Sequence, residues 1–174
     1  MTQPRTPETI GTGEPTPQGA ERIFIVPVMF DCEHFQEGKQ QIRRIYKPKD
    51  SGGWDVFTHT KTAFGDSYTR ETQDHEGVTR GLPSQPKGSV FDKVWGLENP
   101  KLEFTRFRIP YGDHTILYEE YGGELSGLRI ANVELSDETK TQAEAFEPPA
   151  WFGDGVTGNQ DFDPLALATK GSPV

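Results

Sequence analysis

Residues 102–135 read LEFTRFRIPYGDHTILYEEYGGELSGLRIANVEL, and this stretch decides the fold. It predicts three consecutive antiparallel strands, Leu102–Ile109, His114–Tyr121 and Ser126–Leu135. Pro, Gly and Asp separate the first two strands and a Gly-Gly pair follows the second, and these residues adopt the backbone angles of tight turns. The sequence therefore indicates a β-rich, antiparallel core.

The charged side chains of these strands fall on one face of the predicted sheet. Every second side chain of a strand points the same way, which groups Arg106 with Arg108 and adds Glu119 and Glu134 from the following strands. The opposite face is mostly apolar and carries Phe107, Ile109, Ile116, Tyr118, Ala131, Val133 and Leu135. Two placements suit the charged face: a solvated outer surface, which the pattern alone favours, or the lining of a closed barrel with a polar lumen.

Composition limits the class of protein. A chain of 174 residues with 32% hydrophobic residues suits a single domain with a modest core. Residues 1–19 are rich in Pro, Thr, Gly and Gln, so we expect a disordered tail followed by one domain over residues 20–174. The chain has no apolar run of membrane-spanning length and no secretory signal, so we expect a cytoplasmic protein that does not enter a membrane.

Charge and cysteine content exclude further classes. A net charge of -9 argues against a nucleic-acid groove, because such a groove needs a basic face. A single cysteine, Cys32, excludes an internal disulfide framework and a thiolate cluster for zinc.

Alternation and capping signals place the remaining elements around the central stretch. We expect a long loop at Gly77–Gly88 and a short helix after Ser89. A second helix is expected after Ser136 and a last helical turn or two after Asp163. The further strands that we expect are Glu21–Val28, Gln40–Lys47, Trp54–Thr62 and Tyr68–Asp74.

Several motifs follow one another in a recognisable order. They are ERIFIV at 21–26, TRFRIP at 105–110, YEEYGGELSGL at 118–128, ANVEL at 131–135 and FEPPAWFG at 146–153. Together they resemble the CYTH family, also called triphosphate tunnel metalloenzymes, strongly over residues 102–168 and more thinly upstream. The resemblance implies an α+β fold in which a closed antiparallel β-barrel, the triphosphate tunnel, has a few short helices packed outside it. It also moves the charged face from the outer surface to the tunnel lining.

The resemblance implies a chemistry as well as a fold. Family members hydrolyse inorganic triphosphate, thiamine triphosphate or RNA 5′ ends, and one class forms cyclic AMP, which is the less expected activity here. Such hydrolysis needs clustered cations on the phosphoryl oxygens and a divalent metal held by carboxylates. We therefore expect a triphosphate or another polyanionic small molecule as ligand, a nucleotide included, with Mg²⁺ or Mn²⁺ as cofactor.

By resemblance, charged residues of several strands take the family's roles. The expected metal ligands are Glu21, Glu119 and Glu134. The expected substrate-binding residues are Lys61, Arg70, Arg106, Arg108 and Arg44, and the expected catalytic residues are Arg106, Lys61 and Glu134.

The chain also departs from the family pattern. Gly19, Leu117 and Asn132 stand where members carry acids, and Ile23 stands where they carry a lysine. Fewer carboxylates hold a hard dication less strongly. Two hypotheses therefore remain: a triphosphate hydrolase with a reduced metal site, or an inactive relative that binds a phosphorylated ligand or a protein partner.

Overall fold

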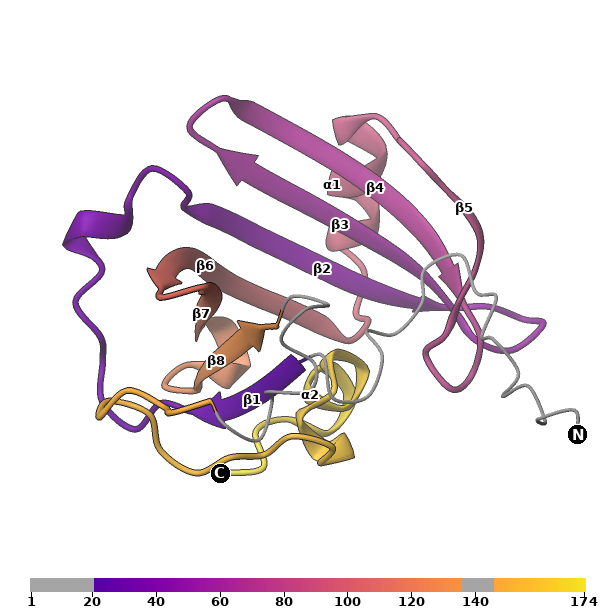
Figure 1. The fold of residues 1–174 in the computed structure, drawn as a ribbon. Helices are drawn as coiled ribbons and strands as arrows, with labels where there is room; N and C mark the ends of the chain where they lie inside the picture. Colours follow the sequence, from indigo (N-terminus) through magenta and orange to yellow (C-terminus); the bar gives the residue numbers. More distant parts are fainter. Residues whose placement is uncertain (1–20, 136–145) are drawn as a thin grey trace, which may run out of the picture.

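The computed structural model describes residues 21–135 and 146–174, and its strands form one antiparallel sheet (Figure 1). The strands hydrogen-bond in the order β1-β8-β7-β6-β2-β3-β4-β5. They are β1 (Glu21–Ile25), β2 (Gln40–Pro48), β3 (Trp54–Thr62), β4 (Gly65–Gln73), β5 (Thr79–Ser84), β6 (Lys101–Tyr111), β7 (His114–Tyr121) and β8 (Arg129–Glu134). The helices are α1 (Gly88–Trp95) and α2 (Pro164–Lys170), and short 3-10 turns lie at η1 (Glu33–Phe35), η2 (Gly123–Leu125) and η4 (Gln160–Phe162).

The structure confirms most of the predicted elements. β3 and β7 have the predicted bounds, and β6 and β8 differ from the prediction only at their ends. α1 and α2 lie where the two helices after Ser89 and Asp163 were expected. The expected N-terminal tail and the helix after Ser136 lie outside the described residues.

One strand was not predicted. β5 lies inside the segment expected to be a loop, and it is an exposed edge strand without apolar alternation. Its pairing depends on the backbone of β4, with Thr72 opposite Arg80, and the Arg80 guanidinium also pairs with Asp74 at 2.8 Å. A strand held in this way leaves no hydrophobic pattern in the sequence.

The two faces of the sheet pack against different helices. On the face that we call the α1 face, Ile45 and Phe57 pack against Phe91 of α1. On the opposite face, which we call the α2 face, Ile42 and Leu102 pack with Leu167 of α2. Each face therefore has its own apolar core, and neither face is purely polar.

On the α1 face, strands β1, β6, β7 and β8 are covered by two loop segments instead of by α1. Segments around residues 30–35 and 146–152 pack there, and the rings of Phe30 and Trp151 stack at 4.1 Å between centroids. The buried residues beneath them include the whole apolar face predicted from the central stretch, namely Phe107, Ile109, Ile116, Tyr118, Ala131, Val133 and Leu135. The predicted apolar face is thus confirmed as core.

Hydrogen bonds between strands do not close the sheet into a barrel. Within the described residues, β1 and β5 form the two ends of the strand order and do not pair with each other. The free edge of β1 is taken by a later segment: the Ile25 amide donates to the Asp154 carbonyl at 2.9 Å, and the Val156 amide donates to the Ile23 carbonyl at 2.8 Å. Because these amides and carbonyls already have hydrogen-bond partners, they are not available to pair with β5. The antiparallel sheet with a few short helices is therefore confirmed, whereas the expected closure is not seen.

Neither α-helix of the described residues could cross a bilayer. α1 has 8 res and α2 has 7 res, far fewer than the roughly 20 apolar residues that a spanning helix needs.

Candidate functional site

An arginine and a glutamate from neighbouring strands form the shortest ion pair of the described residues, and it lies on the α2 face. Arg106 of β6 lies opposite Glu119 of β7 in the sheet register. Its Nη2 and Nε donate to Glu119 Oε1 at 2.6 and 2.9 Å. The Tyr121 hydroxyl donates to Glu119 Oε2 at 2.9 Å, and Glu119 is 3% exposed. Both carboxylate oxygens therefore have a donor, which a buried charge requires.

The same network shifts the acidity of its tyrosine. Burial raises the pKa of Tyr121 well above its ordinary value, and the negative charge of Glu119 beside it raises this pKa further. Tyr121 therefore stays protonated and acts as a hydrogen-bond donor to the carboxylate. The arrangement fixes Glu119 and Arg106 in one geometry.

A second, more open ion pair lies further along the same face. Arg108 Nη2 approaches Glu134 Oε2 at 3.5 Å, with both side chains about half exposed. Glu134 of β8 is the direct cross-strand partner of Glu21 on β1. Burial raises the pKa of Glu21, the charges of Glu119 and Glu134 raise it further, and Arg106 opposes them. Negative charge therefore accumulates here and a cation would relieve it.

A cavity of about 250 Å³ opens beside Glu21, Arg106 and Glu119, and we call it the α2-face cavity. Glu21, Arg44, Arg106, Glu119 and Asn132 are among its lining residues. The Asn132 Oδ1 is buried and accepts no hydrogen bond from the protein. Because a buried acceptor without a donor costs about 1–3 kcal/mol, a ligand or ion at this oxygen would stabilise the site.

The sheet register separates two of the predicted binding residues from the rest. Lys61 and Thr105 are both cross-strand partners of Gln41, so the three residues share one face. Thr105 and Arg106 are adjacent on β6 and point to opposite faces. Lys61 therefore lies on the α1 face, and the sheet does not bring it together with Arg106 at the α2-face cavity.

Arg70 also lies outside the cavity. Its partner on β3 is Phe57, which faces α1, and its guanidinium pairs with Asp55 at 3.0 Å. By contrast, Arg44 lines the cavity, where its Nε donates to the Thr58 hydroxyl at 3.1 Å. Of the five predicted substrate-binding residues, the α2 face brings together Arg44, Arg106 and Arg108.

The three predicted metal ligands share a face but do not form one ligand group. Among the described residues, no three His, Cys, Asp or Glu side chains gather closely enough to hold a metal ion. Glu119 also has both of its oxygens hydrogen-bonded, to Arg106 and Tyr121. The residues left for a hard cation are the carboxylates of Glu21 and Glu134, with the neutral amide oxygen of Asn132, which is two residues from Glu134 on β8.

Two residues of the site were not predicted from the sequence. Tyr121 was not among the predicted site residues, although its position two residues after Glu119 puts both side chains on one face. Asn132 was taken as a lost acid, and its unpartnered oxygen is visible only once burial is known. The alternation of side chains could have identified Tyr121, whereas nothing in the sequence indicates the unpartnered oxygen of Asn132.

Comparison with known proteins points to one kind of enzyme. No family model matches the chain. It is 36% identical over 81 residues to an inorganic triphosphatase of Nitrosomonas europaea, covering 45% of this chain and 52% of that protein. It is 37% identical over 62 residues to an inorganic triphosphatase of Acetivibrio thermocellus, covering 36% of this chain and 37% of that protein. The matched part thus spans about half of the first relative and less of the second.

The likeness in three dimensions extends over more of the chain. The crystal structure of the inorganic triphosphatase NE1496 matches with a TM-score of 0.68 and 26% sequence identity, covering 85% of this chain and 92% of that one. A second structure of NE1496 gives a TM-score of 0.69 and 25% identity. The arrangement of strands described above is therefore shared with a known triphosphatase.

Proposed function

We propose that this chain is a phosphohydrolase that acts on a triphosphate, with the α2-face cavity as its substrate site. The observation that carries the proposal is the gathering of guanidinium and carboxyl groups from β1, β2, β6 and β7 around that cavity, with Glu134 of β8 on the same face. The inorganic triphosphatases to which the chain is similar support the same reading. The substrate we propose first is inorganic triphosphate.

The arginines of the cavity are the proposed substrate-binding groups. Guanidinium groups bind phosphate oxygens through paired hydrogen bonds, which are stronger than those between neutral groups. Arg106 is held by Glu119, so it presents its remaining donors without first having to be ordered. Arg108 lies on the same face outside the lining of the cavity, and at 52% side-chain exposure it is free to turn from Glu134 toward a substrate. Arg44 also lines the cavity.

We further propose that Mg²⁺ or Mn²⁺ takes part, held by Glu21, Glu134 and the amide oxygen of Asn132. The raised pKa of Glu21 and the unpartnered oxygen of Asn132 support a cation at this place. When bound, the metal would draw charge from the phosphoryl oxygens and orient the attacking water. Glu119 is proposed to position Arg106 instead of binding the metal.

The test is release of phosphate from tripolyphosphate, ATP and thiamine triphosphate, with Mg²⁺ or Mn²⁺. We expect turnover of tripolyphosphate that falls by at least about a hundredfold in Arg106→Ala and Glu134→Gln, as when one preorganised electrostatic group is removed. Lys49→Met, which removes a partly exposed cation from the β2–β3 turn, is the matched control and should keep full activity. Tight binding of tripolyphosphate without turnover would refute the hydrolase and favour a phosphate-binding protein.

A further inference from the structure

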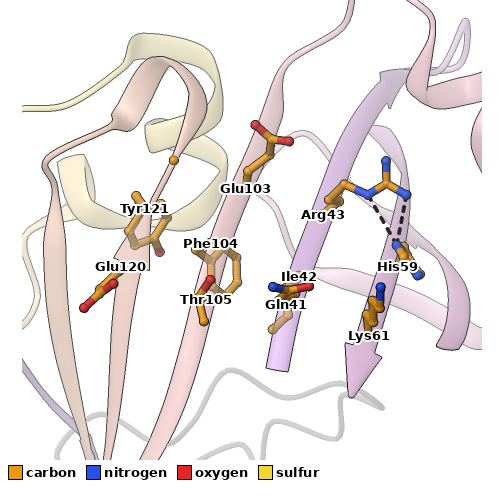
Figure 2. Close-up of a pocket in the computed structure, with 11 residues that line it drawn as sticks. Gln41, Ile42, Arg43, His59, Lys61, Glu103, Phe104, Thr105, Glu120 and Tyr121 are labelled. Atoms are coloured by element: carbon orange, nitrogen blue, oxygen red, sulfur yellow. Dashed lines mark hydrogen bonds between the residues drawn. The ribbon is translucent and has the colours of Figure 1, made fainter. Parts of the chain in front are cut away.

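A second and larger cavity lies on the α1 face, on the other side of the sheet from the proposed active site. Its volume is about 600 Å³, within the range of small-molecule sites. It occupies the part of this face between the cover formed by α1 and the cover formed by residues 30–35 and 146–152. Figure 2 shows that its polar side chains come from β2, β3, β6 and β7.

One side of this α1-face cavity is cationic. Arg43 of β2 and Lys61 of β3 line it there (Figure 2). The guanidinium of Arg43 lies over the rings of Phe91 and Trp95, at 5.1 and 5.2 Å from their centroids. Cation–π contact and stacking of this kind hold an arginine at a fixed angle.

A histidine locks the orientation of Arg43. The Nε and Nη2 of Arg43 both approach His59 Nδ1, at 3.3 and 3.0 Å. Because a guanidinium can only donate, Nδ1 is the acceptor and the proton of the neutral ring is on Nε2, 2.7 Å from Asp66 Oδ1. The ring of His59 is stacked on Tyr68 at 4.7 Å. Asp66, His59 and Arg43 thus form a chain that ends at the cavity.

The other side of the cavity is acidic. Glu103 of β6 and Glu120 of β7 line it there (Figure 2). Glu103 is the direct cross-strand partner of Arg43, yet no ion pair joins them, because Arg43 turns to His59 instead. Of the ion pairs formed by the described residues, none includes Glu103, Glu120 or Lys61. Two cations and two carboxylates therefore face one space without neutralising each other.

We propose that the α1-face cavity binds a small zwitterion, such as a short peptide, with its anionic group at Arg43 and Lys61 and its ammonium group at Glu103 and Glu120. The four charges sum to zero, so a polyanion gains at one wall and is repelled at the other, whereas a zwitterion gains at both. Arg43 and Glu120 lie on strands two intervals apart, on the order of 10 Å. An extended tripeptide separates its termini by about the same distance. Gln41 and Thr105, between the walls, can bond its peptide groups.

The experiment uses triglycine and two capped forms as probes, on the full chain and without triphosphate. Backbone amide shifts of the cavity residues in heteronuclear NMR report binding. N-acetyl-triglycine lacks the ammonium group and triglycine amide lacks the carboxylate. Because each cap removes one charge-assisted contact, we expect each capped form to bind about tenfold more weakly than triglycine.

Two variants assign each end of the ligand. In Arg43→Gln we expect triglycine and triglycine amide to bind equally weakly, because the partner of the carboxylate is gone. In the double variant Glu103→Gln/Glu120→Gln we expect triglycine and N-acetyl-triglycine to bind equally. Lys49→Met is the control that removes a charge elsewhere, and thermal unfolding checks that each variant is folded.

The proposal is overturned if triglycine causes no saturable shifts at tens of millimolar, or if N-acetyl-triglycine or inorganic phosphate binds as well as triglycine. Inorganic phosphate binding alone would show a plain anion site. Neither result bears on the triphosphatase, because the two cavities lie on opposite faces of the sheet.

Discussion

Replacing Glu119 by glutamine separates the two roles that this residue could have. The change keeps the shape of the side chain and removes its charge. In the structure Glu119 is 3% exposed and receives hydrogen bonds from Arg106 and Tyr121 on its two oxygens. If it positions Arg106, its loss should mainly destabilise the fold. If it is a metal ligand, as the family resemblance implies, its loss should mainly raise the requirement for metal.

The magnitude follows from the contacts. Removing one partner of a buried ion pair costs about 3–5 kcal/mol. Arg106 retains 26% side-chain exposure, so water can solvate part of its charge, and a glutamine oxygen can keep one of the bonds. We therefore expect Glu119→Gln to lower the free energy of unfolding by about 2–3 kcal/mol. For a chain of this length that is a fall of about 4–12 °C in Tm.

Two assays measure the two effects. Guanidinium chloride unfolding, followed by tryptophan fluorescence, gives the free energy of unfolding. Phosphate release from tripolyphosphate at increasing Mg²⁺ gives the half-saturating metal concentration. Glu134→Gln is the matched control, because its ion pair with Arg108 is half exposed and is worth at most about 1 kcal/mol. Glu134→Gln should leave stability nearly unchanged and raise the Mg²⁺ requirement.

The reasoning fails if Glu119→Gln is as stable as the wild type. It also fails if this variant raises the half-saturating Mg²⁺ concentration as much as Glu134→Gln does. The first result would mean that Glu119 does not hold Arg106 in place, and the second would assign Glu119 to the proposed metal site.

Three further predictions concern single residues of the two cavities. The pKa of Glu21 is raised in the folded protein, so the wild type loses stability as the pH rises above the ordinary carboxyl pKa of 4.5. Glu21→Gln should therefore raise the free energy of unfolding at neutral pH and leave it unchanged well below pH 4.5. Urea unfolding at a series of pH values checks this. Asn132→Leu removes a buried oxygen that has no donor, so the free energy of unfolding should rise by about 1–3 kcal/mol. The same variant should lose metal-dependent turnover. His59→Phe keeps the stacking on Tyr68 but frees Arg43 to pair with Glu103, so triglycine should bind about tenfold more weakly by NMR titration.

The sequence was sufficient where neighbouring strands follow one another in the chain. Alternation placed Arg106 and Glu119 on one face, and the hairpin between β6 and β7 makes them cross-strand partners. The face on which Lys61 and Arg70 lie could not be predicted, because it depends on the pairing of β2 with β6, two strands far apart in the chain. A shift of that register by one residue exchanges the faces of every side chain on β2, β3 and β4. Alternation within each strand cannot supply this register.

Closure of the sheet is a second feature that depends on distant parts of the chain. The amides and carbonyls of Ile23 and Ile25 are bonded to residues 153–157, more than a hundred residues later. Gly153 permits this approach, since a Cβ there would lie 2.9 Å from the Ile25 carbonyl oxygen. No pattern of side chains in β1 distinguishes a barrel seam from an edge covered by such a segment.

The strand register, which places Lys61 on the α1 face, also explains why the two faces of one sheet form cavities with different charge arrangements. On the α2 face, charges pair with their cross-strand neighbours, as Arg106 does with Glu119. On the α1 face, α1 places aromatic rings beneath Arg43, and His59 turns it away from Glu103. An arginine and a glutamate are thus cross-strand neighbours on both faces, but they form an ion pair only on the α2 face. Arg43 and Glu103, which do not pair, can each bind one charge of a zwitterionic ligand. Arg106, which is held by Glu119, can bind an anion, and the unpartnered oxygen of Asn132 nearby can bind a metal.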